Sequence, residues 1–84
     1  MKVLYRFHST GDDQIDANSI NYLQKAQAYL KAELSQYERE PGAIQLWLDD
    51  DSRLNHTLID CGPIEQEVRL VLQAFFDMDH EDRT

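Results

Sequence analysis

The chain of 84 residues is long enough for one small domain and too short for two. Sixteen acidic residues outweigh eight Lys and Arg, and the net charge of −8 argues against direct binding to nucleic acid or to anionic membranes. A single cysteine, a start without the apolar core of a signal peptide, and no apolar run near the ~18 residues of a membrane span predict a cytoplasmic protein without disulfides.

The first predicted element is a strand over Lys2–His8, because its aromatic and branched residues alternate with the others. Gly11 and the two aspartates after it end this strand. Asp16 or Asn18 then caps a helix by accepting hydrogen bonds from the free amides of its first turn.

The helix that follows is predicted to be about twenty residues long, because its core stripe recurs at steps of three and four. Gln27 is the one polar member of this stripe. Pro41 and Gly42 end the element. The stripe consists of Ile20, Leu23, Gln27, Leu30, Leu34 and Tyr37.

Two further strands and a second helix complete the predicted chain. Ile44–Leu48 and Leu54–Cys61 are the strands, joined by the polar turn 49–53. Gly62 and Pro63 begin the last helix, since proline has no amide to leave unsatisfied at the first helical position. Its inward stripe is Ile64, Val68, Val71, Phe75 and Met78, widened by Leu72.

The order of elements predicts an α+β fold, a two-layer sandwich of the type β-α-β-β-α. The strand–helix–strand unit favours a right-handed crossover between parallel strands, and the short turn favours an antiparallel hairpin. The result is a three-stranded mixed sheet. Because each helix has one apolar stripe, we expect both helices on one face of the sheet.

The other face of this sheet is expected to present Leu4, Arg6, Gln45 and Trp47. An exposed Trp beside a Leu can support a homodimer or a partner. The alternative is that Trp47 packs under a loop or a long side chain.

No pattern in the sequence predicts an enzyme, a metal site or a cofactor. Gly11, Gly42 and Gly62 do not form a phosphate-binding cluster. His56 and Cys61 lie five residues apart, an odd spacing that places strand side chains on opposite faces. The three histidines share no ligand spacing with one another or with the cysteine.

Negative charge is concentrated in the second half of the chain. Residues 1–40 have a net charge of −1 and residues 41–84 a net charge of −7, which sum to −8. Asp77, Asp79, Glu81 and Asp82 stand at the C-terminal end of the last helix, where the helix dipole favours cations instead. We interpret these carboxylates as a surface that docks on a basic protein partner. The alternative is a solvating tail, and 79–84 of the single domain 1–84 is expected to fray.

The layout, the length and the acidic last helix resemble the DinI family of small bacterial proteins induced by DNA damage. MKVLYRF stands at the first strand, YEREPG at the end of the first helix, IQLWL at the second strand and EQEVRLVLQAFFDMD at the last helix. The chain departs from the family in having GPIEQE where the family's last helix is rich in Lys and Asp, and in lacking its C-terminal tryptophan motif. The resemblance implies a modulator of the RecA recombinase filament, with the four carboxylates as contacts.

Two functions follow as hypotheses. The first is a non-enzymatic acidic binding protein that docks its carboxylate-rich helix end on a basic protein, without binding nucleic acid itself. The second is a structural or assembly subunit that forms a homodimer through the Leu4 and Trp47 face of the sheet, its acidity serving solubility alone.

Overall fold

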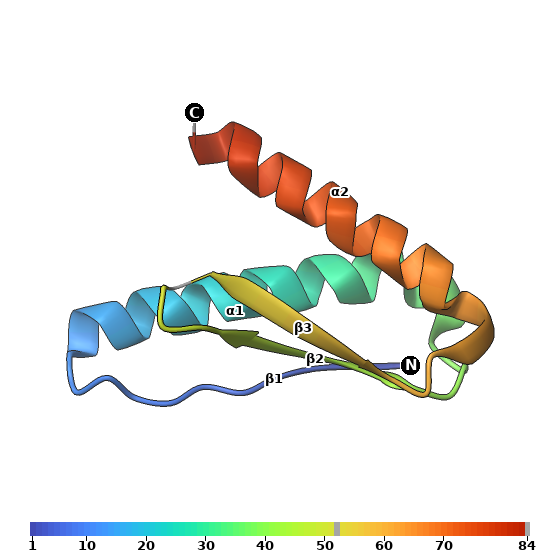
Figure 1. The fold of residues 1–84 in the computed structure, drawn as a ribbon, viewed down its shortest axis with the longest axis horizontal. Coiled ribbons are helices and arrows are strands. Elements are labelled where there is room, and N and C mark those ends of the chain that lie inside the picture. Colours follow the sequence, from blue (N-terminus) through green and yellow to red (C-terminus); the bar gives the residue numbers. More distant parts are fainter. Residues whose placement is uncertain (52, 84) are drawn as a thin grey trace.

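The computed structural model describes residues 1–51 and 53–83, with side chains described as far as Met78. The elements follow one another in the predicted order β-α-β-β-α, with two short 3₁₀ turns added (Figure 1). Their bounds are β1 Lys2–Tyr5, α1 Asp13–Glu33, η1 Ser35–Tyr37, β2 Ala43–Leu48, β3 Leu54–Ile59, η2 Gly62–Ile64 and α2 Glu65–Arg83.

The sheet is mixed, as predicted, and its strand order is β1-β2-β3. β1 pairs in parallel with β2, with Val3 beside Ile44. β2 pairs antiparallel with β3, with Ile44 opposite Leu58 and Leu46 opposite His56. β2 is therefore the central strand, and β1 and β3 form the two edges.

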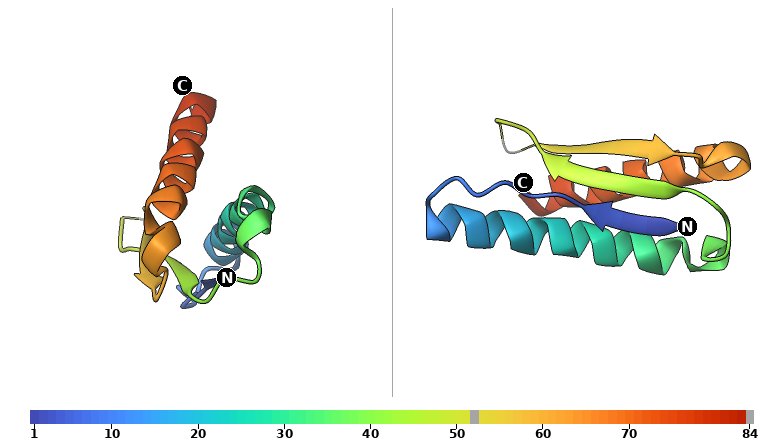
Figure 2. Two further views of the ribbon diagram at one scale, coloured as in Figure 1. Left: turned by 90° about the vertical axis from the view of Figure 1, so that its right-hand side faces the viewer. Right: turned by 90° about the horizontal axis from the view of Figure 1, so that it is seen from below.

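Both helices lie on the same face of the sheet, which confirms the two-layer architecture (Figure 2). The core lies between the layers because one face of β1 and β2 meets the apolar stripes of α1 and α2. Its buried members are Val3, Leu23, Ala26, Leu30, Leu34, Ile44, Leu46, Ile64, Val68, Leu72 and Phe75. None of the described helices is both long enough and apolar enough to span a membrane.

The cap of α1 is Asp12, and the prediction of Asp16 or Asn18 was wrong. The Asp12 carboxylate accepts hydrogen bonds from the amides of Gln14 and Ile15. Asp16 lies inside the helix and instead accepts bonds from the preceding loop. The helix starts earlier because the polar segment after Gly11 contains an acceptor at the first position where one is needed.

The far end of α1 and the lengths of two strands also differ from prediction. α1 ends at Glu33, and Tyr37 lies in the 3₁₀ turn that follows. β1 ends at Tyr5, not at His8, and β3 ends at Ile59, not at Cys61. The end of β3 has a local cause, because Asp60 takes a φ of 53° and turns the chain out of the sheet.

Helix α2 packs through its first turns and then rises away from the sheet (Figure 1). Val68, Leu72 and Phe75 are buried as predicted. Met78 is 43% exposed, so its predicted place in the core was wrong. The reason is the direction of the helix, because its last turns have no sheet below them.

Candidate functional site

The C-terminal end of α2 has an excess of carboxylates, which the sequence offsets only in part with Arg83. Residues 70–82 contain four Asp or Glu and no Lys or Arg. Arg69, about two turns before Asp77, donates to Glu65 at 2.6 Å across the helix surface. Asp77 is exposed and accepts a hydrogen bond from the Gln73 amide at 3.0 Å. Its charge is thus available to a partner.

The backbone is helical as far as Arg83, and this decides how the predicted contact residues are placed. Positions 77 and 81 lie four apart and share one side of a helix, whereas positions 79 and 82 share the opposite side. These four positions are therefore distributed around the helix and do not form one row. The side chains of Asp79, Glu81 and Asp82 lie outside the described residues, and the frayed tail over 79–84 stays a prediction.

The outer face of the sheet is not covered by either helix (Figure 2). Leu4 on this face is 47% exposed. Trp47 is half-buried, and the guanidinium of Arg6 lies 4.5 Å from the centre of its ring. This cation–π contact stabilises the pair. Arg6 is thus a long side chain that covers Trp47, as in the alternative given for this residue from the sequence.

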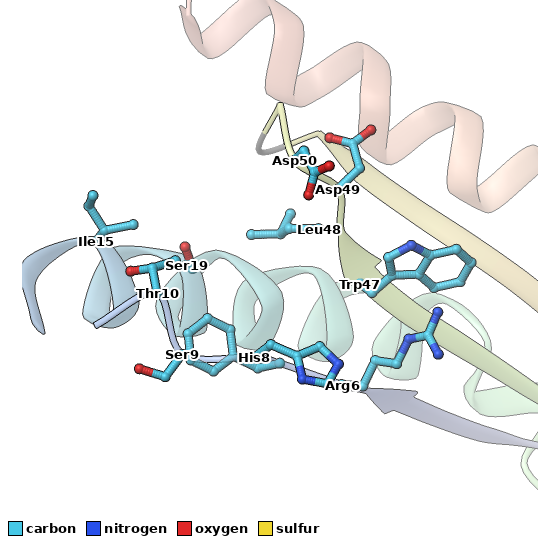
Figure 3. Close-up of a pocket in the computed structure, with 11 residues that line it drawn as sticks. Arg6, His8, Ser9, Thr10, Ile15, Ser19, Trp47, Leu48, Asp49 and Asp50 are labelled. Carbon is cyan, nitrogen blue, oxygen red and sulfur yellow. The ribbon is translucent and has the colours of Figure 1, made fainter. Parts of the chain in front are cut away.

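A hollow of about 510 Å³, which the sequence did not predict, lies beyond the ends of β1 and β2 (Figure 3). It is lined by Arg6 and the loop after β1, by the first turns of α1, and by the end of β2. Figure 3 shows the Arg6 side chain alongside Trp47, with Asp49 and Asp50 at the opposite rim. Such hollows commonly form at the carboxyl ends of parallel strands. This rule could have predicted the hollow from the expected pairing of the first two strands.

The carboxylates in and beside this hollow accept hydrogen bonds that stabilise the turns around it. Hydrogen bonds from the hydroxyl of Ser9 and from the amide and hydroxyl of Thr10 lower the pKa of Asp16. A bond from the amide of Arg53, followed by one from the Asn55 side chain, lowers the pKa of Asp49. These carboxylates fix the polar loops at this end of the fold.

Cys61 and His56 are not brought together by any contact that the structure describes. The Cys61 thiol is buried and donates to the carbonyl oxygen of Ala43 at 3.6 Å. His56 faces α2, with its ring 6.3 Å from that of Phe76, and burial lowers its pKa, with Arg69 adding to the effect. Within residues 1–51 and 53–78, no group of three His, Cys, Asp or Glu is placed to hold a metal ion.

The arrangement thus offers three surfaces: the acidic end of α2, the uncovered sheet face and the hollow. The resemblance to the DinI family stays a prediction, carried by layout and charge. Comparison with known proteins finds no matching family model, no matching curated protein and no matching solved structure.

Proposed function

We propose that this protein is a non-enzymatic binding module that docks the acidic end of α2 on a basic surface of another protein. The observation that carries the proposal is the run 70–82, which combines four carboxylates with no Lys or Arg on a helix that rises away from the sheet. A projecting helix end can enter a basic socket without moving the core.

Electrostatics gives this docking a physical basis. The C-terminal end of a helix carries partial negative charge, so each added carboxylate there costs a few tenths of a kcal/mol. A cationic surface relieves that repulsion when it binds. Because the described carboxylate of this group, that of Asp77, is exposed, the attraction is screened by salt. Carboxylates around a helix end also resemble backbone phosphates, which makes a nucleic-acid-handling protein a suitable partner.

A filament of a RecA-class recombinase on single-stranded DNA is the partner that the family resemblance favours. The test is a titration of the filament with wild-type protein and two variants, each reduced from a net charge of −8 to −4. The end variant carries Asp77→Asn, Asp79→Asn, Glu81→Gln and Asp82→Asn. The control carries Glu33→Gln, Glu38→Gln, Glu40→Gln and Glu67→Gln, all at exposed positions.

We expect the end variant to bind roughly tenfold more weakly, since four exposed ion pairs together contribute on the order of 1–2 kcal/mol. The control variant should bind like the wild type. If both variants bound the filament equally weakly, the loss would be due to the lower net charge and not to the end of α2. No binding by the wild type at low salt would remove the recombinase as partner.

A second candidate function is assembly through the outer face of the sheet. The exposure of Leu4 and the absence of a helix over this face favour it. Trp47→Ala should then convert a dimer to a monomer in sedimentation velocity. A monomeric wild type would remove this candidate.

A further inference from the structure

The two edges of the sheet are protected very differently. At the β1 edge, residues 2 and 6 donate their amides to β2, so the main-chain groups of Val3 and Tyr5 point outward. Helix α1 covers this edge, and the side chain of Gln27 donates to the carbonyl oxygen of Val3 at 2.7 Å. The β1 edge is therefore blocked by the protein itself.

At the β3 edge the outward groups belong to Leu54, His56 and Leu58. Asp49 donates its amide to the carbonyl oxygen of Arg53, so in this antiparallel ladder the odd-numbered residues of β3 bond to β2. The even-numbered ones face away. No hydrogen bond from the part of the chain that the structure describes reaches their main-chain groups.

The sequence of β3 does nothing to discourage pairing at this edge. Natural edge strands are usually short or carry a charge, a proline or a bulge that prevents association. β3 is six residues long, LNHTLI, and has no charged residue and no proline, although 29% of the whole chain is charged. Leu54 and Leu58 are only half-buried, and Ile59 is 44% exposed.

We propose that β3 pairs antiparallel with β3 of a second copy of this chain, forming a continuous six-stranded sheet about a two-fold axis. A second copy fits because two molecules of charge −8 repel across their acidic surfaces, whereas β3 is neutral. The side chains of the strand are also complementary. Antiparallel pairing sets apolar Leu54 beside Leu58 of the other copy, and polar Asn55 beside Thr57.

The register that pairs residues 54–58 of the two copies has its two-fold axis at His56. Each even-numbered residue then exchanges two main-chain hydrogen bonds with its counterpart. Leu54 lies opposite Leu58 of the second copy on the helix-covered face, and the two His56 side chains are direct neighbours. On the outer face Thr57 lies opposite Asn55. This interface is separate from the acidic end of α2, so the dimer does not depend on the proposed docking function.

The test measures association and amide exchange on the same protein. Sedimentation should show a concentration-dependent dimer. Amide exchange followed by NMR should show His56 and Leu58 protected at high protein concentration and exchanging fast on dilution. Thr57 and Ile59 should stay protected throughout, because their amides bond to β2.

A matched pair of variants makes the test specific. Thr57→Glu places an added negative charge near the axis in each copy and should give a monomer, whereas Thr57→Gln should dimerise like the wild type. The side chain of Thr57 is exposed, and circular dichroism verifies that both variants fold. A wild-type monomer at all concentrations would overturn the proposal. So would a dimer that Trp47→Ala abolishes while His56 and Leu58 exchange fast.

Discussion

The carboxylate of Asp12 accepts hydrogen bonds from two amides that the start of α1 would otherwise leave unsatisfied, those of Gln14 and Ile15. We expect Asp12→Ala to lower the free energy of unfolding by about 1 kcal/mol, the usual effect of losing such a cap. Asn18→Ala, at an exposed position inside the helix, should leave it unchanged or raise it by a few tenths, since alanine has the higher helix propensity. Urea denaturation measures both, and an equal effect of the two variants would contradict the assignment of the cap.

Asp16 ties the loop after β1 to the helix, and this connection depends on pH. Hydrogen bonds from Ser9 and then Thr10 hold its pKa below the ordinary 3.8. A carboxyl group with a lowered folded-state pKa stabilises the fold above its unfolded-state pKa and loses that contribution as pH falls through the folded-state pKa. Asp16→Asn should therefore be less stable than wild type near pH 7. The difference should shrink below about pH 3.8, and urea denaturation over a pH series measures it.

At the scale of elements, the link between α1 and β2 depends on Gly42. Its φ is 116°, and an added Cβ would lie 2.8 Å from the carbonyl oxygen of Asp60. Gly42→Ala combines backbone strain with a main-chain clash and should cost more than about 2 kcal/mol. Gly11→Ala is the matched control, with a positive φ and open space around it, and should cost about 1 kcal/mol. Thermal unfolding of the two variants compares them, and equal costs would contradict the close contact.

The proposed β3 dimer has its own pH dependence. His56 faces Arg69 and Phe76 of α2, and burial, with Arg69 adding, lowers its pKa below 6.5. Below this lowered pKa both copies gain a charge at the two-fold axis, and the like charges oppose pairing. The dimer should therefore weaken as pH falls through this lowered pKa, and it should not change with pH well above it. His56→Gln should flatten this dependence in sedimentation, and an unchanged slope would exclude the register centred on His56.

The order of elements and the sheet topology were predictable from periodicity and turn residues, because burial of one face imposes a repeat on each element. Gln27, the polar residue in the α1 stripe, makes a contact between α1 and β1 that periodicity cannot specify. Its bond to Val3 depends on how α1 is placed over β1. For the same reason the open edge of β3 and the hollow beyond β2 were not predicted. The exposure of Met78 follows from the angle of α2, which is a property of the packed molecule.

On the scale of the whole molecule, charge is unevenly distributed over the surface. The strands of the outer sheet face carry no acidic residue, and Lys2 and Arg6 are cationic there. Acidic residues lie in the turns, on the helices and at the end of α2. Such segregation separates a surface that tolerates a second copy from surfaces that attract a basic partner.

The central claim, that the end of α2 recruits a basic protein, is tested most directly by affinity capture from the native host. Wild type, the end variant and the charge-matched control are compared at low and high salt. We predict a protein retained by wild type and control at low salt, released at high salt, and missing from the end variant. The same set of proteins retained by all three forms would contradict the claim.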